Sequence, residues 1–388
     1  MITFKTFTFL IEEEDQSSHL GHLDHPYQMH VLYGKRGAEQ AVNDLKSAHD
    51  YFTTGKSNKI SASRKVDGGV SVIISNHPTF GPSVSTKSAF NVKPKINYTE
   101  EDIDKNHGHA PGLASTLKHL LKHGKNLVNS GHSVQGDVLC TSEPKKTEDN
   151  KVSTTPNRIE YRHEGAPKKF GIALHTEYEG NTAKTGVSPK AINSTKNIFV
   201  ADTDFTPKPE HYSEQNRNIA SKHLELAKEL VNKHGDHFDV SKEHKEHILT
   251  YMNSLRSEAG PIATPTHQGY IDHLNKIKER KKASVKTSRA KEEKESHFNE
   301  LLNEVNNNKS KFKSIFDFHD HINKVTEALT STLAHNKASN FSSHIDNAPS
   351  TDEGIVIANK SNRNILFKLV PNKIASALKY NPRFNRTP

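Results

Sequence analysis

Cysteine and apolar residues are scarce in this chain. Cys140 is the only cysteine among 388 residues, so an intramolecular disulfide cannot form and a thiolate zinc site lacks its ligands. Hydrophobic residues make up 32% of the chain, and the mean hydropathy is −0.79. Because these values are low for a compact globule, we expect one well-packed core beside a polar region that is largely helical or mobile.

Long apolar runs and a secretory leader pattern are also lacking. No window approaches the roughly 18 consecutive apolar residues that a membrane span needs. An acidic run at residues 12–15 interrupts the N-terminal apolar stretch. We therefore expect no membrane partner and an intracellular, cytoplasmic location.

Positive charge is in excess. Lys and Arg total 54 against 45 Asp and Glu, which gives a formal net charge of +9, and 26 histidines can add charge below neutral pH. This balance favours a polyanionic partner such as nucleic acid, bound through salt-dependent phosphate contacts. Mere solubility explains the charge equally well.

Apolar spacing predicts alternating strands and helices in the first half of the chain, within one large or two smaller domains. We expect a docking helix or strand over residues 1–10, a loop from there to about residue 33 and an amphipathic helix over 37–52. A returning strand is expected over 83–88, followed by a helix over 113–121 that Gly124 ends.

The middle of the chain, residues 181–345, is predicted to be mainly helical. One helix follows Ser241, a plausible N-cap, and another spans 315–329. The segment 276–294 is dense in both charge signs, which is typical of a solvated helix or a linker. Strand-like patterning resumes at Gly354.

The stretch Lys65-Val66-Asp67-Gly68 is the centre of the candidate site that the sequence predicts. It lies between an extended segment, 60–64, and a β-branched run, 70–74. We expect Lys65 in a tight turn between two strands, with Gly68 and Gly69 supplying backbone conformations that other residues resist. Taken alone, the motif is more typical of a solvated surface lysine in a hairpin turn.

Further segments follow in order at strand-like positions. They are VQGDVL at 134–139, FGIALH at 170–175, EGIVI at 353–357 and ILFKL at 365–369. With the Lys65 stretch, this series resembles the motif set of the covalent nucleotidyltransferases, the superfamily of ATP-dependent DNA ligases, RNA ligases and mRNA capping enzymes. The resemblance does not extend to the middle of the chain.

The resemblance implies an α+β, ligase-type nucleotidyltransferase fold with antiparallel sheets flanked by helices. Residues 1–180 and 346–388 would form the adenylation domain, and residues 181–345 a mainly helical insertion that is a candidate for nucleic-acid binding. Too few residues follow Lys368 for the C-terminal OB domain of DNA ligases and capping enzymes.

The resemblance also implies that Lys65 attacks the α-phosphorus of ATP to form lysyl-AMP. Because a free lysine with a pKa of about 10.4 is protonated, its pKa must be depressed by cations or by desolvation. Lys368 is the implied cationic neighbour and α-phosphate contact, and Mg²⁺ is the implied cofactor. Glu353 would bind the metal directly or through water, and Asp67 would support the metal or orient the lysine.

Nucleotide-binding roles follow in the same way. Asp137 matches the carboxylate that holds the ribose hydroxyls, although a solvated strand end is the alternative. Phe170 or His175 would stack on adenine, and Val356 or Ile355 would cover its opposite face, with core packing as the alternative.

Other positions extend or depart from the motifs. Lys87, on the expected strand after the Lys65 turn, would contact phosphate or the nucleic-acid backbone. DNA ligases carry Arg where this chain has Val70, and Ser63 and Val370 replace a frequent Glu and a second Lys. Lys360 or Lys373 would have to compensate for Val370.

Histidines near the N-terminus suggest a second kind of site. His19, His22 and His25, with His30 nearby, are spaced for metal ligands on a helix, but Gly21 and Pro26 argue against a regular helix there. Surface or loop histidines are therefore the preferred interpretation.

Taken together, these features favour an ATP-dependent, RNA ligase-like polynucleotide ligase that seals 5′-phosphate and 3′-hydroxyl ends. The alternatives are a minimal DNA ligase and a catalytically degenerate nucleic-acid-binding protein of the same fold. A chain rich in Asn, Lys and His, with an isolated core enzyme, would suit a large DNA bacteriophage. The cytoplasm would then be that of the host. Nicked or broken polynucleotide is the expected partner of a monomer.

Overall fold

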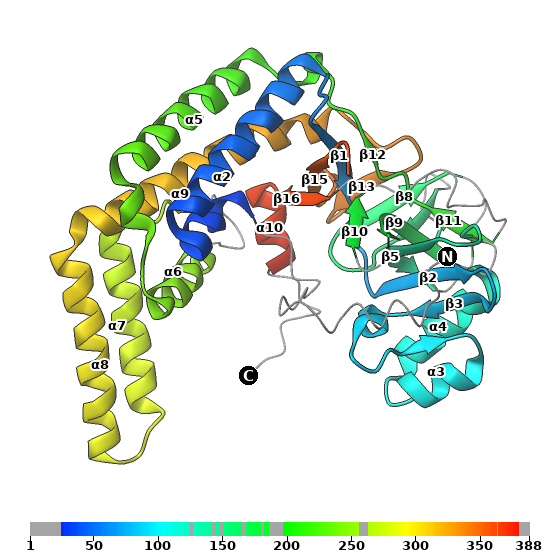
Figure 1. Cartoon of the computed structure of the whole chain (residues 1–388), viewed down its shortest axis with the longest axis horizontal. Coiled ribbons are helices and arrows are strands. Elements are labelled where there is room, and N and C mark those ends of the chain that lie inside the picture. The colour runs from blue at the N-terminus through cyan, green and yellow to red at the C-terminus, as the bar shows by residue number, and fades with distance from the viewer. Residues whose placement is uncertain are drawn as a thin grey trace.

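The computed structural model describes residues 25–124, 127–141, 145–146, 151–164, 168, 170–179, 182–185, 197–255, 263–362 and 364–379. The protein is a mixed α+β structure. Most of the helices gather on one side of the molecule, and the sheets lie on the other together with α3 (Glu100–His107) and α4 (Pro111–Gly124) (Figure 1). The α+β class expected from the sequence is confirmed.

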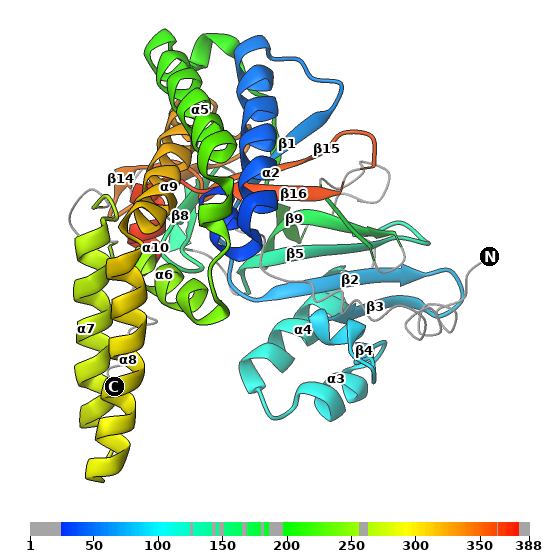
Figure 2. The same ribbon diagram turned by 60° about the vertical axis from the view of Figure 1, so that its left-hand side comes forward.

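A lobe of helices forms one side of the protein. It contains α2 (Pro26–Thr54), α5 (Glu214–His234), α6 (Lys242–Ser254), α7 (His267–Ala283), α8 (Ser288–Asn307) and α9 (Lys309–Thr330), with the short turns η2 (Pro209–His211), η3 (Gly235–Phe238) and η4 (Ser331–Ala334). Side chains of Ser213, Ser241, Thr266 and Thr287 cap the N-termini of α5 to α8. Figure 2 shows α7 and α8 extending together as a hairpin.

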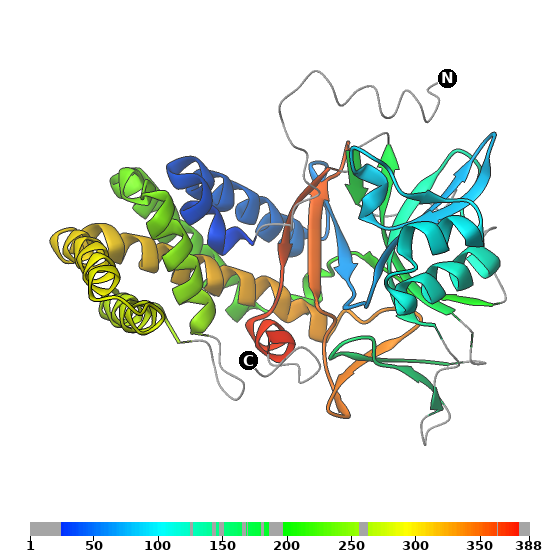
Figure 3. The ribbon, with the colours of Figure 1, turned by 90° about the horizontal axis from the view of Figure 1, so that it is seen from below.

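A four-stranded antiparallel sheet lies against this lobe, in the order β12-β1-β15-β16. Its strands are β12 (Asp204–Phe205), β1 (Ile60–Lys65), β15 (Gly354–Asn359) and β16 (Ile365–Leu369). Figure 3 shows this sheet between the helical lobe and a second, larger sheet. Residues far apart in sequence therefore pair directly, since β1 and β15 are neighbours.

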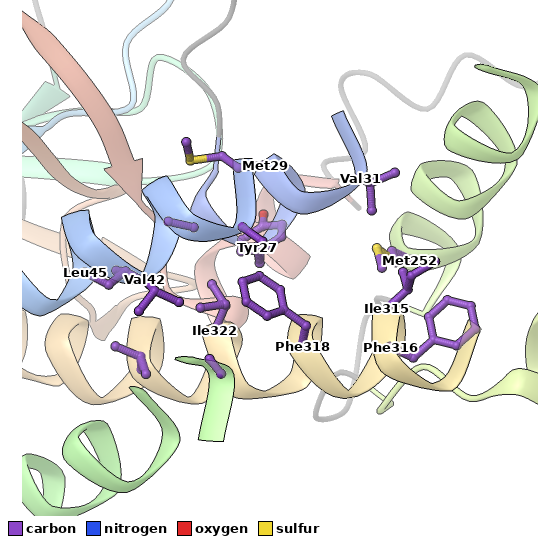
Figure 4. Packing of buried hydrophobic residues seen from close by; sticks show 14 of the residues in the cluster. Tyr27, Met29, Val31, Val42, Leu45, Met252, Ile315, Phe316, Phe318 and Ile322 are labelled. Atoms are coloured by element: carbon purple, nitrogen blue, oxygen red, sulfur yellow. The ribbon is translucent and has the colours of Figure 1, made fainter. Parts of the chain in front are cut away.

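The largest hydrophobic core fills the space between the helices and the four-stranded sheet. Ile355, Ile357 and Phe367 of the sheet belong to it, together with buried side chains of α2, α5 and α9. Figure 4 shows Val42 and Ile322 meeting between α2 and α9. Because the helices share this core with the sheet, the helical segment is part of the same folded body.

The second sheet has seven strands, in the order β10-β9-β5-β2-β3-β4, with β11 pairing in parallel to β9. Its strands are β2 (Ser71–His77), β3 (Gly81–Ser85), β4 (Ile96–Asn97), β5 (Ser133–Cys140), β9 (Phe170–Glu179), β10 (Thr182–Thr185) and β11 (Ile198–Val200). The helices α3 (Glu100–His107) and α4 (Pro111–Gly124) contribute Ile103, Leu117 and Leu120 to the core on one face.

A third sheet completes the described structure. Its order is β14-β13-β8-β7-β6, with β6 (Lys145–Lys146), β7 (Val152–Thr154), β8 (Glu160–His163), β13 (Ser342–Ile345) and β14 (Ala348–Pro349). The turn η1 (Lys87–Phe90) and the helix α10 (Asn372–Lys379) lie outside the sheets. No helix of the described residues has both the length and the apolarity to cross a membrane.

Several expected elements are confirmed. The helix over 113–121 is α4, which ends at Gly124, and the helix after Ser241 is α6, whose His244 amide donates to the Ser241 side chain. The helix over 315–329 lies within α9. Residues 276–294 fall in α7 and α8, so the segment is helical rather than a linker. The docking element expected over residues 1–10 lies outside the described residues.

The loop expected up to residue 33 is wrong, because α2 already begins at Pro26. Tyr27, Met29, His30 and Val31 are all buried, so this part of the helix lacks the polar face that marks an amphipathic pattern. The chain departs from helical geometry only at Gly34, where φ is 62°.

The expected boundaries of the helical segment, 181–345, also differ from the observed ones. Strands β10, β11 and β12 fall inside this range and join the sheets, as does β13 near its end. The helical part therefore begins at η2 and ends at η4. Short strands at 198–200 and 204–205 carry too little alternation to be recognised from sequence.

Candidate active site

Lys65 lies at a crossover between two sheets. Strand β1 belongs to the four-stranded sheet and β2 to the seven-stranded sheet. The tight turn expected between these strands is instead a crossover, because the two strands pair with other segments and not with each other. The stretch 66–70 carries the chain from one sheet to the other.

Strand alternation decides which side chains share the face of Lys65. In the register of the sheet, Lys65 is opposite Gly354, and Val356 is opposite both Ser63 and Lys368. Residues directly opposite each other point to the same face. Since the intervening Ile355 and Ile357 face the helices, Lys65, Val356 and Lys368 point away from the helical lobe.

The Lys65 ammonium donates a hydrogen bond to the Glu353 carboxylate and forms an ion pair with it. The Glu353 side chain is 12% exposed and that of Lys65 is 25% exposed, so the lysine remains accessible. Burial raises the pKa of the Glu353 carboxyl and the Asp67 charge raises it further, whereas Lys65 and Lys368 oppose the rise. Lys368 therefore lies within electrostatic reach of the same carboxylate.

Backbone contacts fix the crossover against β5. The Gly69 amide donates to the Val138 carbonyl at 2.8 Å, and the Val138 amide donates to the Val70 carbonyl at 2.9 Å. A Cβ atom at Gly68 would lie 2.2 Å from the Cβ of Asp137. Glycine is thus required at position 68 by close approach, and not by a left-handed conformation as expected from the sequence.

Asp137 is consequently held beside Lys65. Its Oδ1 lies 3.6 Å from Nε2 of His175, whose Nδ1 is 2.7 Å from the Thr176 hydroxyl. Burial raises the pKa of the Asp137 carboxyl, but His175, Lys65 and Ser71 together bring it below its ordinary value. Asp137 is therefore an anionic side chain, 23% exposed, next to a cationic one.

Asp67 holds the crossover in place through hydrogen bonds. Its Oδ1 accepts from the Asn157 side chain at 2.8 Å, and its Oδ2 accepts from the Arg158 amide at 3.4 Å. The Asp67 amide donates to the Tyr161 hydroxyl at 2.5 Å. Burial raises the pKa of the Asp67 carboxyl, which these hydrogen bonds oppose. This geometry favours a role in holding the Lys65 turn.

Phe170 does not reach this group. It is fully buried in the core between the seven-stranded sheet and α4, with its ring stacked on His119 at a centroid distance of 5.9 Å. Phe170 as the adenine-stacking residue is therefore wrong. His175, at a position of opposite parity in β9, lies on the other face with Asp137.

The sequence pattern predicts Lys87 on a strand, and this prediction is also wrong. It opens the 3₁₀ turn η1 instead of lying on a strand, because β3 ends at Ser85 and the Thr86 side chain caps the turn. The Lys87 side chain is exposed. Val370, where the nucleotidyltransferases that the sequence resembles carry a second lysine, is buried in a small core with Val66 and Tyr161.

The side chains beside Lys65 supply only part of a ligand set for a divalent ion. No three His, Cys, Asp or Glu side chains within the described ranges converge in a way that could hold a metal ion. Mg²⁺, however, is commonly bound by one or two carboxylates together with substrate phosphates and water. Glu353 suits that mode, whereas both Asp67 oxygens already accept hydrogen bonds.

The N-terminal histidines do not form a described metal site. His19 and His22 lie outside the described residues. His30 is fully buried in α2, where its Nε2 is 3.1 Å from the Ile315 carbonyl oxygen. Burial lowers the pKa of His30 well below its ordinary value, so it is a neutral core histidine.

Sequence reasoning missed a second ion pair beside the first. Arg64 donates through Nη1 to Asp352 Oδ2 at 2.6 Å and through Nη2 to the Asn336 carbonyl at 2.8 Å. Both side chains are buried, and the Ser343 hydroxyl donates to Asp352 Oδ1 at 2.6 Å. The adjacent charges Arg64-Lys65 and Asp352-Glu353 were the available signal.

The family of unknown function DUF6267 matches residues 20–379 of the chain. No curated protein and no solved structure matches it.

Proposed function

The chain belongs to this family of unknown function, and from the geometry of its candidate site we propose that it is an ATP-dependent polynucleotide ligase of nucleotidyltransferase fold. The observation that carries the proposal is the contact between Lys65 and Glu353, residues separated by 288 positions. Asp137 and Lys368 lie within electrostatic reach of the same pair. A solvated hairpin lysine would have no such surroundings.

Lys65 is the proposed nucleophile. Its Nζ forms a bond to the α-phosphorus of ATP, the bond from that phosphorus to the bridging oxygen breaks, and pyrophosphate leaves with the electron pair. Nζ must lose one proton before the attack and a second one after it, and both pass to solvent, because Glu353 is the proposed ligand of the metal. Lys368 is the proposed contact of the α-phosphate.

The nucleotide would lie between the two sheets. Asp137 is the proposed partner of the ribose hydroxyls, because it is ionised and partly exposed. His175 and Val356 are the proposed contacts on the two faces of adenine. Val356 is 8% exposed on the Lys65 face of its strand.

Mg²⁺ is the proposed cofactor, held by Glu353 and by the phosphates of the nucleotide. The ion would supply positive charge that stabilises the negative charge developing on the transferred phosphoryl group. Asp67 would act on it only indirectly, through the position of the Lys65 turn.

Strand joining is the proposed overall reaction. AMP passes from Lys65 to a polynucleotide 5′-phosphate, and a 3′-hydroxyl then displaces AMP and forms the phosphodiester bond. The net charge of +9 supports a polyanionic substrate. RNA-containing ends are the proposed substrate, since Val70 stands where DNA ligases carry Arg. The Val70 side chain is 42% exposed.

The test is covalent labelling with α-labelled ATP and Mg²⁺, followed by denaturing electrophoresis. Wild type should retain the label and Lys65→Ala should not, whereas Lys59→Ala, an exposed lysine just before the same strand, should label normally. A panel of nicked duplexes and single strands with 5′-phosphorylated DNA or RNA ends then tests joining. Unlabelled wild type would instead favour a nucleic-acid-binding protein without catalysis.

A further inference from the structure

The hairpin of α7 and α8 has an apolar base and a polar end. Tyr270, Leu274 and Ile277 of α7 are buried, as are Phe298 and Leu301 of α8. No side chain from 278 to 297 is buried. The distal half of the hairpin therefore contributes little to the core and projects from the helical lobe (Figure 1, Figure 2).

Positive charge is concentrated at this distal end. Residues 280–291 contain six basic side chains and no acidic one. These are Arg280, Lys281, Lys282, Lys286, Arg289 and Lys291. All are exposed except Lys282, which is 24% exposed, and Arg289 is 90% exposed. We call residues 280–291 the basic tip.

Only part of this charge is neutralised within the hairpin. Lys282 pairs with Glu295 at 2.8 Å, and Arg289 pairs with Glu293 at 3.0 Å. Among the described residues, no ion pair joins Arg280, Lys281, Lys286 or Lys291 to a carboxylate. The basic tip therefore presents uncompensated cations to solvent.

Helix stability does not account for the whole pattern. Arg280, Lys281 and Lys282 occupy the last turn of α7, where cations interact favourably with the helix dipole. Arg289 and Lys291 instead lie in the first turns of α8, where the dipole disfavours cations and acidic residues are preferred. Charge placed against the dipole, next to like charges, requires another reason.

The basic tip groups its cations at one end of the hairpin, in the last turn of α7, the connecting residues and the first turns of α8. A surface kept soluble by charge would intersperse both signs evenly. A cluster in which cations outnumber the carboxylates that pair with them is an arrangement that phosphate backbones recognise.

We propose that the basic tip binds the phosphate backbone of the nucleic acid whose ends the candidate site joins. The proposal rests on the proposed function for the identity of that nucleic acid. The tip makes contacts that are independent of base sequence and distant along the chain from Lys65. It therefore contributes to substrate affinity and not to the formation of lysyl-AMP.

The experiment compares two variants that each lose four positive charges. The tip variant is Arg280→Gln, Lys281→Gln, Lys286→Gln and Lys291→Gln, and the control variant is Lys105→Gln, Lys222→Gln, Lys228→Gln and Lys309→Gln, all at exposed positions. Affinity is measured by fluorescence anisotropy with a fluorescein-labelled nicked duplex and a labelled single strand, over a salt series. Thermal unfolding confirms that each variant folds.

The tip variant should bind at least tenfold more weakly at low salt, while the control variant changes less than threefold. The magnitude of the slope of log K against log salt for the duplex should fall by about 3.6 in the tip variant, since each of the four lost phosphate contacts lowers it by about 0.9. Equal losses in the two variants would overturn the proposal. So would a tip-dependent capture of anionic phosphatidylserine vesicles without any effect on nucleic acid.

Covalent labelling by ATP separates this proposal from the proposed function. A tip variant that labels like wild type but binds nucleic acid weakly supports the basic tip as a substrate contact. If wild type does not label and the tip variant still binds weakly, the ligase proposal fails and the tip remains a nucleic-acid contact. If labelling is normal and binding is unchanged, only the tip proposal is overturned.

Discussion

Arg64 and Asp352 form a buried ion pair one residue before Lys65 and Glu353 in their respective segments, with 2.6 Å between Nη1 and Oδ2. The Arg64 side chain is 3% exposed and that of Asp352 is 7% exposed. Arg64 also lies over the Phe205 ring at 5.5 Å. The pair thereby joins β1 to the start of β15 and sets the position at which Lys65 meets Glu353.

Removing one partner of this pair should destabilise the fold strongly. Asp352→Ala leaves the Arg64 guanidinium buried without its carboxylate, and such losses cost about 3–5 kcal/mol of unfolding free energy. Asp104→Ala is the matched control, because Asp104 of α3 pairs with Lys118 at 2.7 Å but is 59% exposed. The control should cost less than about 1 kcal/mol. Urea unfolding measures both, and equal changes would contradict the structural role of the pair.

Gly68→Ala should disturb the site through sterics alone. The added methyl group would lie 2.2 Å from the Asp137 Cβ and 3.1 Å from its backbone, so either β5 or the Lys65 turn must move. Overpacking of this kind costs about 1–3 kcal/mol, and covalent labelling by ATP should fall at least tenfold. In Gly112→Ala the methyl group meets no atom within 4 Å, so stability and labelling should stay near wild type. Normal labelling of Gly68→Ala would show that Asp137 need not be held beside Lys65.

His175 and Phe170 should respond in opposite ways to truncation. Phe170→Ala empties a fully buried site and should cost about 3–5 kcal/mol of stability, with little specific effect on the KM for ATP. His175→Ala removes a side chain that is 29% exposed beside Asp137, so the melting temperature should hardly change while KM rises about tenfold. Labelling kinetics at several ATP concentrations measure KM. An unchanged KM in His175→Ala would remove His175 from the nucleotide site.

Asp44 should make stability depend on pH. Burial raises the pKa of its carboxyl to about 6, whereas the ordinary value is 3.8. Between these values the folded state holds a proton that the unfolded state has lost, so the contribution of this group to stability falls as pH rises from about 4 to 6. The unfolding free energy of Asp44→Asn relative to wild type should therefore rise by about 1–2 kcal/mol when the pH is raised from 4 to 8. This range is already reduced for the partial exposure of Asp44 to solvent.

The control for this prediction is Asp50→Asn on the same helix. Asp50 is 60% exposed and pairs with Lys46 at 3.0 Å, so its replacement should change stability by less than about 0.5 kcal/mol at either pH. Urea unfolding at both pH values measures the difference. A gain in Asp44→Asn that is the same at pH 4 and pH 8 would mean that Asp44 titrates normally.

The sequence by itself determined the local elements with strong signals. The helices α4 and α9 follow from apolar spacing, and the start of α6 follows from the capping side chain of Ser241. Each depends on residues within a few positions of one another, so the pattern is visible along the chain. The order of the segments carrying Lys65, Asp137 and Glu353 was visible in the same way.

Only the tertiary structure decided which faces and segments meet. Alternation in β9 places Phe170 and His175 on opposite faces but does not say which face α4 covers. The pairing of β1 with β15 brings Arg64 to Asp352, which is 288 positions away, and no local pattern encodes that contact. Such choices depend on the total burial and hydrogen bonding of the assembled sheets, which are properties of the whole fold and not of any one stretch.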